Sequence, residues 1–237
     1  MKRRLILSCS VPLLTGIAIP AVPAHAAVPL CFGEPATIIG TNGPDTLVGR
    51  DNVSDVIYGA GGDDVISGAQ DWYDPGTAPD LLCGGPGHDS IGGSPGNDKI
   101  NGGDGNDHLD GHRGSDVVQG NAGNDTIEDE SFADADSGND IMRGGIGDDR
   151  ISIAWGIDKA YGDAGNDRII DWECDTSYLY GGTGADYFES YQSSFEGGEY
   201  CVVGGKDYIN GNEHFDKAMA SANDSVTGVE NVIRVSG

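Results

Sequence analysis

Five consecutive nonapeptides fill residues 84 to 128, which read GGPGHDSIG, GSPGNDKIN, GGDGNDHLD, GHRGSDVVQ and GNAGNDTIE. Each has glycine at its first and fourth positions, aspartate at its sixth and an aliphatic residue at its eighth. Glycine permits a tight, partly left-handed turn that a Cβ would obstruct. The last three residues are expected to form a short strand whose middle side chain points into a core. These middle residues are Ile91, Ile100, Leu109, Val118 and Ile127. Each nonapeptide therefore predicts a turn followed by a strand.

The turn of each nonapeptide has the oxygen donors that calcium prefers. The sixth-position aspartate contributes a hard carboxylate oxygen, and the glycines let backbone carbonyls face inward. The pattern G-G-x-G-x-D-x-U-x resembles the RTX, or hemolysin-type, calcium-binding repeat family. The resemblance implies an all-β, right-handed parallel β-roll with two nonapeptides per coil, which folds when it meets extracellular calcium. It also implies that several calcium ions are held by sixth-position carboxylates and backbone carbonyls of neighbouring turns.

The same nine-residue register extends outward to residues 40 and 189, but the match to the repeat pattern differs between alternate units. Counted from residue 40, every odd unit from the first to the fifteenth is intact, whereas most even units carry insertions or lack glycines. Odd turns would stack along one edge of the roll and even turns along the other. We predict a continuous row of calcium ligands on the odd edge: Asp45, Asp64, Asp89, Asp107, Asp125, Asp149, Asp167 and Asp186. On the irregular even edge we predict an ion shared by Asp98 and Asp116, in a row extended by Asp140 and Asp158. For any single aspartate the alternative is a solvated turn residue.

The first 26 residues predict a cleavable secretory signal peptide. Lys2, Arg3 and Arg4 precede an apolar run, and a small-x-small cleavage site ends at Ala26. Removal of this leader leaves ten bases against 39 acids, a formal charge near −29. Such a polyanion is a poor partner for nucleic acid or anionic membranes, and no other segment approaches the roughly 18 apolar residues of a membrane helix. We predict a secreted protein, not inserted in a membrane, with a signal peptide (1–26), an N-terminal cap (27–39), the roll (40–189) and degenerate repeats with a C-terminal cap (190–237).

The four cysteines that follow the leader, Cys31, Cys83, Cys174 and Cys201, allow three pairings in an oxidising compartment. Cys83 and Cys174 are about ten units apart, which corresponds to roughly 24 Å along the roll. A disulfide tolerates at most about 7 Å between Cα atoms. We therefore predict the pairs Cys31–Cys83 and Cys174–Cys201, which would staple the irregular edge at each end of the roll. Free thiols or a metal site are the alternative.

Signs of other chemistry are sparse. The histidines lack metal-ligand spacing and no serine stands in a nucleophile elbow. Trp72, Tyr73, Trp155 and Trp172 all fall in even units and form a candidate surface for a glycan or protein partner, unless they pack the insertions against the roll. We favour a structural or binding role over an enzymatic one. The alternative is a secreted enzyme, or an accessory subunit of one, with a site built from the insertions at 68–83 and 129–143.

Overall fold

The structure, a computed structural model, describes residues 28–70, 77–129, 138–172, 176–190, 208–211, 217–221, 225–229 and 231–235. All the regular secondary structure in these segments is β-strand. No helix in them is long and apolar enough to cross a membrane. The predicted signal peptide lies outside the described residues and stays a prediction.

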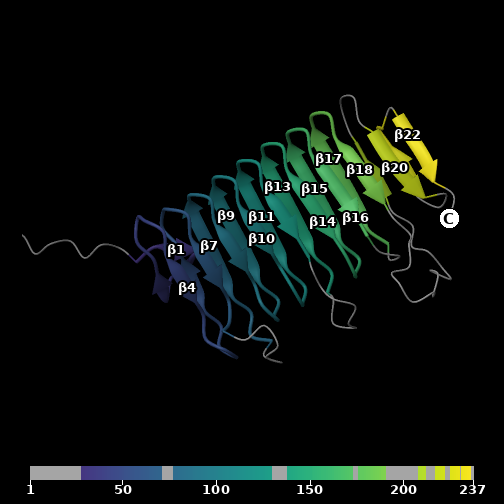
Figure 1. Cartoon of the computed structure of the whole chain (residues 1–237). Helices are drawn as coiled ribbons and strands as arrows, with labels where there is room; N and C mark the ends of the chain where they lie inside the picture. Colours follow the sequence, from purple (N-terminus) through teal and green to yellow (C-terminus); the bar gives the residue numbers. More distant parts are fainter. Residues whose placement is uncertain are drawn as a thin grey trace, which may run out of the picture.

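The chain alternates between two sheets of ten parallel strands and so forms a solenoid (Figure 1). Sheet 1 consists of β4 (Thr46–Val48), β6 (Val65–Ser67), β8 (Ser90–Gly92), β10 (His108–Asp110), β12 (Thr126–Glu128), β14 (Arg150–Ile153), β16 (Arg168–Asp171), β18 (Tyr187–Ser190), β20 (Lys217–Ser221) and β22 (Asn231–Val235). Sheet 2 consists of β3 (Ile38–Ile39), β5 (Val56–Tyr58), β7 (Leu81–Pro86), β9 (Lys99–Asp104), β11 (Val117–Ala122), β13 (Ile141–Ile146), β15 (Lys159–Ala164), β17 (Tyr178–Thr183), β19 (Tyr208–Asn210) and β21 (Ser225–Thr227). This arrangement confirms the predicted parallel β-roll, in which each coil contains one strand of each sheet.

Residues at the same repeat position stack from coil to coil. In sheet 1, Leu109 pairs in register with Ile91 and Ile127. In sheet 2, Val117 pairs with Ile141, although the unit at 129–143, to which Ile141 belongs, carries an insertion before it. The insertions therefore leave the strand register intact.

The core is a double column of aliphatic side chains, one from the middle of each short strand. All five residues that the nonapeptides predict as core are at most 2% exposed. The cluster contains Ile57, Ile66, Leu82, Ile91, Ile100, Leu109, Val118, Ile127, Met142, Ile151, Ile153, Ala160, Ile169, Leu179, Phe188 and Ile209. Because each coil contributes only about two such side chains, the turns must contribute the rest of the stability.

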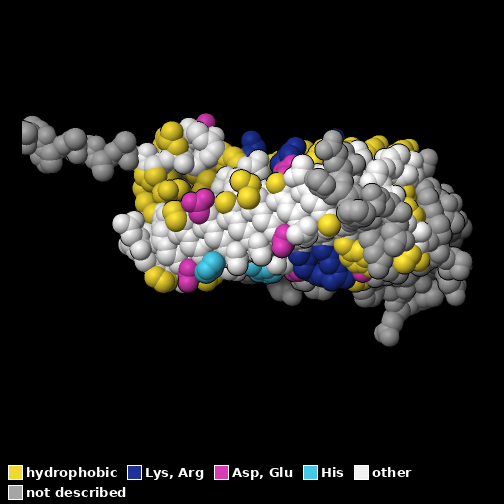
Figure 2. All heavy atoms as spheres, turned by 90° about the horizontal axis from the view of Figure 1, so that it is seen from above, with side chains coloured by type: hydrophobic (Ala, Val, Ile, Leu, Met, Phe, Trp, Pro, Cys, Tyr) yellow, Lys and Arg dark blue, Asp and Glu magenta, His cyan; other side chains and the backbone are white. Residues whose placement is uncertain are grey.

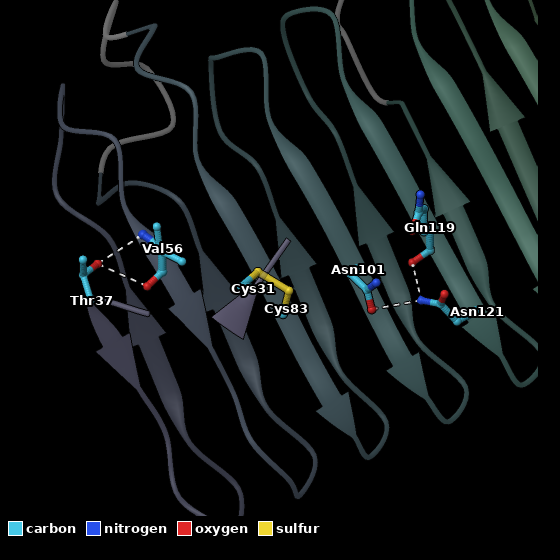
Figure 3. The surroundings of a disulfide bond; sticks show 7 residues. All are labelled: Cys31, Thr37, Val56, Cys83, Asn101, Gln119 and Asn121. Atoms are coloured by element: carbon cyan, nitrogen blue, oxygen red, sulfur yellow. Dashed lines mark hydrogen bonds between the residues drawn. A yellow bond between two sulfur atoms is a disulfide. The ribbon is translucent and has the colours of Figure 1, made fainter. Parts of the chain in front are cut away.

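A small antiparallel hairpin covers the N-terminal end, formed by β1 (Leu30–Cys31) and β2 (Glu34–Pro35). The predicted disulfide between Cys31 and Cys83 is present, with 5.8 Å between the Cα atoms, and it ties this hairpin to β7 of sheet 2 (Figure 3). Nearby, the hydroxyl of Thr37 is hydrogen-bonded to the backbone of Val56, which joins the hairpin's outgoing chain to β5 (Figure 3). The other two cysteines lie outside the described residues, so their pairing stays a prediction.

Candidate metal centre

The sixth-position aspartates of the odd units form one continuous row. The backbone N–H of Asp89 donates to Oδ1 of Asp107 at 2.9 Å, and that of Asp107 donates to Oδ1 of Asp125 at 2.8 Å. The same bond recurs along the whole edge. It links Asp45, Asp64, Asp89, Asp107, Asp125, Asp149, Asp167 and Asp186, the eight residues of the predicted odd row.

The second carboxylate oxygen has no such donor over the middle of this row. The Oδ2 atom is buried without a hydrogen-bond partner in Asp64, Asp89, Asp107, Asp125, Asp149 and Asp167. A buried carboxylate is stable only when its charge is compensated or neutralised. These oxygens therefore require either a proton or a cation.

The first glycine of each unit keeps open the space that these oxygens face. A Cβ on Gly102 would collide with Oδ2 of Asp107 and would lie 3.0 Å from the carbonyl oxygen of Gly120 in the next coil. A Cβ on Gly120 would likewise collide with Oδ2 of Asp125 and lie 2.7 Å from the carbonyl oxygen of Gly144. A carboxylate oxygen and a carbonyl oxygen of neighbouring coils thus converge where a side chain is absent. This all-oxygen donor set fits calcium.

The even edge has its own continuous row, which includes the four predicted residues and extends beyond them to Asp55 and Asp80. Backbone N–H donors link each aspartate to Oδ1 of the next at 2.7 to 2.8 Å, through Asp55, Asp80, Asp98, Asp116, Asp140 and Asp158. We call these six residues the even row. Asp55 and Asp80 were missed because their units have extra residues. The signal was present nonetheless, since both begin an intact D-x-U-x ending, DVIY and DLLC.

Groups supplied by the chain occupy the N-terminal ends of both rows and the C-terminal end of the even row. Asp45 accepts hydrogen bonds at Oδ2 from the backbone N–H and, at 2.9 Å, the hydroxyl of Thr41. Asp55 is held by Arg50, whose guanidinium lies 2.6 Å from Oδ1. At the other end of the even row the sixth position is Ser177, whose Oγ accepts from the N–H of Asp158 at 3.5 Å. The first aspartate of each row thus has donors from the protein for its Oδ2 atom, which the aspartates in the middle lack.

Burial raises the pKa of the aspartates in the middle of both rows. It raises the pKa of Asp89 to about 6 and of Asp107 to about 7, with neighbouring aspartates adding to the effect and backbone hydrogen bonds opposing it. On the even row burial raises the pKa of Asp98 to about 8 and of Asp116 to about 9. Protons and cations should therefore compete for these carboxylates near neutral pH.

Sixteen of the acidic side chains that the structure describes are buried. Figure 2 shows one face on which backbone and uncharged side chains dominate and carboxylates appear singly. Within the described segments, no three His, Cys, Asp or Glu side chains converge as a metal cluster. An ion would therefore need backbone carbonyls for much of its coordination shell.

The fifth position of the repeat has a structural role that the sequence interpretation missed. The N–H of Asn106 donates to Nδ1 of His88 at 2.8 Å, and the N–H of Asn124 donates to Oδ1 of Asn106 at 2.8 Å. These exposed side chains join successive turns. The recurrence of Asn, Asp or His at this position was the available signal.

The predicted aromatic surface is only partly described. Trp155 and Trp172 are each 37% exposed, and Nε1 of Trp172 donates to Oγ of Ser152 at 2.7 Å. Trp72 and Tyr73 lie outside the described residues, as do 71–76 and 130–137 of the two insertions. The shared surface and the enzymatic alternative both stay predictions.

Comparison with known proteins bears on this geometry. The model of the RTX calcium-binding nonapeptide repeat matches residues 54–71, 84–118, 92–127, 132–152 and 153–175. No curated protein matches the chain. The matched residues include the middle of both aspartate rows.

Proposed function

Because this chain belongs to the RTX calcium-binding repeat family, we propose that it is a secreted protein that folds on binding calcium and has a structural or binding role. The observation that carries the proposal is the middle of the odd row, where the Oδ2 atoms of six aspartates are buried without hydrogen-bond partners and each faces the space beside a glycine. Calcium would supply the positive charge that these oxygens lack.

Without a cation the rows oppose folding. Carboxylates about 5 Å apart repel by roughly 1 to 3 kcal/mol per pair at effective dielectric constants between 80 and 20. This cost recurs at every coil, while each coil contributes only about two core side chains. We therefore infer that the calcium-free chain is expanded at neutral pH.

Folding that depends on calcium is suited to a secreted protein. The predicted leader would direct the chain out of the cell, where calcium is abundant and binding sites of modest affinity suffice. The chain would then fold after export. Trp155, partly exposed on the even edge, supports a glycan or protein partner as the binding role.

Circular dichroism tests the proposal directly. The purified protein should lack a β-sheet spectrum at neutral pH in chelator and should regain it cooperatively as calcium is added. The Asp107→Asn variant keeps an Oδ1 acceptor for the N–H of Asp89 but loses the negative charge. A tenfold weakening at one site corresponds to about 1.4 kcal/mol of stability in excess calcium.

The matched control is Asp148→Asn. Asp148 occupies the exposed fifth position of its turn, where its Oδ1 accepts from the N–H of Asn166, and asparagine performs that role in other coils. D148N should resemble the wild type, whereas D107N should be less stable in calcium. A protein that is fully folded in chelator at neutral pH would reject the proposed function.

A further inference from the structure

Asp129 stands where the repeat has a glycine. It follows β12 and occupies the first position of its even unit. Its N–H donates to the carbonyl of Ser152 at 3.0 Å, as the N–H of Gly111 donates to the carbonyl of Glu128 in the preceding coil. The backbone therefore keeps the repeat register, and the side chain enters space that glycine leaves open elsewhere.

The geometry of the preceding coils shows where such a side chain points. A Cβ on Gly93 would lie 2.7 Å from Oδ2 of Asp98, and a Cβ on Gly111 would lie 2.7 Å from Oδ2 of Asp116. In each case the contact is with the sixth-position carboxylate of the same unit. The first-position side chain of Asp129 is thus directed at Asp140.

Asp129 and Asp140 are both buried, being 5% and 2% exposed. Both carboxylate oxygens of Asp129, and Oδ2 of Asp140, are buried without a hydrogen-bond partner. One unit therefore presents three such oxygens, whereas a unit such as that of Asp116 presents one. This is the greatest concentration of uncompensated carboxylate oxygen in the part of the chain that the structure describes.

The two carboxylates strongly disfavour carrying charge together. Their carboxyl groups lie close enough to share a proton. The pair must share either a proton or a cation.

The next coil has an apolar residue where Asp129 stands. Ile153 occupies the equivalent first position, because it follows Ser152, which pairs in register with Glu128, the residue before Asp129. Ile153 is fully buried and pairs in turn with Asp171 of the following coil. An apolar side chain there offers nothing to an ion beside Asp158. The first position of the even units thus provides a carboxylate in the Asp129 coil and an apolar side chain in the next coil.

We propose that Asp129 and Asp140 hold a calcium ion at a site that the repeat pattern does not contain, with Asp129 as a ligand in place of glycine. The inference rests on the proposed function, since it assumes that the roll binds calcium. The additional carboxylate raises the ligand charge, which strengthens calcium binding, so this site is the tightest of the even row.

Counting calcium ions in the folded protein tests the site. Asp129→Asn is nearly isosteric, and its amide can donate a hydrogen bond to Asp140 as a protonated Asp129 would. Asp129→Ser is a second variant, since Ser190 occupies the equivalent position in a later coil and is 2% exposed. Asp148→Asn is the control for loss of one negative charge.

Two measurements give the count. Bound calcium is determined by mass spectrometry of the metal after equilibrium dialysis, and the logarithm of the unfolding constant is plotted against that of free calcium, with a slope equal to the ions released on unfolding. D129N and D129S should each bind and release one ion fewer than the wild type, and D148N the same number as the wild type. A variant that needs more calcium to fold should be restored by raising its concentration.

The outcomes separate this site from the general function. A wild type that binds no calcium would reject the proposed function. A wild type that folds on calcium, with D129N retaining its full ion count, would overturn only this site and would show that Asp129 shares a proton with Asp140. A folding defect of D129N and D129S that added calcium does not relieve would overturn it as well.

Discussion

The guanidinium of Arg50 lies 2.6 Å from Oδ1 of Asp55, whose side chain is completely buried. The backbone N–H of Arg50 donates to Oδ2 of the same carboxylate at 2.7 Å. Asp55 is the first residue of the even row, and its two oxygens are satisfied, whereas Oδ2 of Asp98 and of Asp116 has no donor. The chain therefore supplies its own cation at the N-terminal end of this row.

The Arg50→Gln substitution should make the N-terminal end of the roll depend on calcium. Loss of the guanidinium leaves a buried carboxylate without its counter-ion. We expect a lower thermal midpoint at limiting calcium and a smaller decrease in excess calcium, where an ion can compensate the charge. Thermal unfolding at both calcium concentrations, followed by circular dichroism, measures the difference.

Arg143→Gln is the control for this substitution. Arg143 pairs with Asp163 at 3.1 Å, and the two side chains are 43% and 38% exposed, so this pair should contribute little. Equal midpoint shifts for R50Q and R143Q at limiting calcium would contradict the role assigned to Arg50.

Acid should partly replace calcium. Burial raises the pKa of Asp89 to about 6, of Asp149 to about 7 and of Asp98 to about 8, above the usual value near 3.8. The folded state then binds protons more readily than the unfolded chain at intermediate pH. Calcium-free stability is therefore fully present below about pH 4 and is lost as the pH rises through the folded-state pKa values of about 6 to 8. Circular dichroism in calcium-free buffers across this range should show β structure at the acidic end only, and a calcium-free protein equally folded at both ends would disagree.

The glycine beside each ladder carboxylate should be required for calcium-loaded stability. A Cβ at position 102 would collide with Oδ2 of Asp107, so Gly102→Ala should cost at least the roughly 1 to 3 kcal/mol of an overpacked site, together with weaker calcium binding. Gly43→Ala is the control, because a Cβ there meets nothing within 4 Å. It should change stability by no more than about 0.5 kcal/mol. Denaturant unfolding in excess calcium gives both values, and similar values for G102A and G43A would show that the space is not needed.

The disulfides give a separate test of the coil register. Cys31 and Cys83 are 52 residues apart in sequence, and a loop of this size corresponds to about 4 kcal/mol in the chain-entropy model. Replacing both by serine should lower the free energy of unfolding by an amount of this order. Peptide mapping without reduction should also recover Cys174 joined to Cys201. A peptide joining Cys83 to Cys174 would be incompatible with the coils that separate them.

The sequence by itself determined the coil, its core and the odd row. A nine-residue period with glycine, aspartate and an aliphatic residue at set positions specifies turn and strand locally. The repeat alone therefore places Leu109 in a strand and Asp107 in a turn. Two such units per coil then stack Asp107 between Asp89 and Asp125. The prediction of the roll and its core was confirmed because the periodicity is local and unbroken.

The tertiary structure alone decided which irregular residues join these rows and how the rows end. Asp80 aligns with Asp98 because the interstrand hydrogen bonds fix the strand register, whatever the number of residues inserted before the turn. The pairing of Arg50 with Asp55, and the direction of Asp129 toward Asp140, depend on which groups the folded coil places side by side and removes from water. Residue spacing specifies the repeat, but only the packed coils show which buried carboxylates already have a partner and which still need a cation.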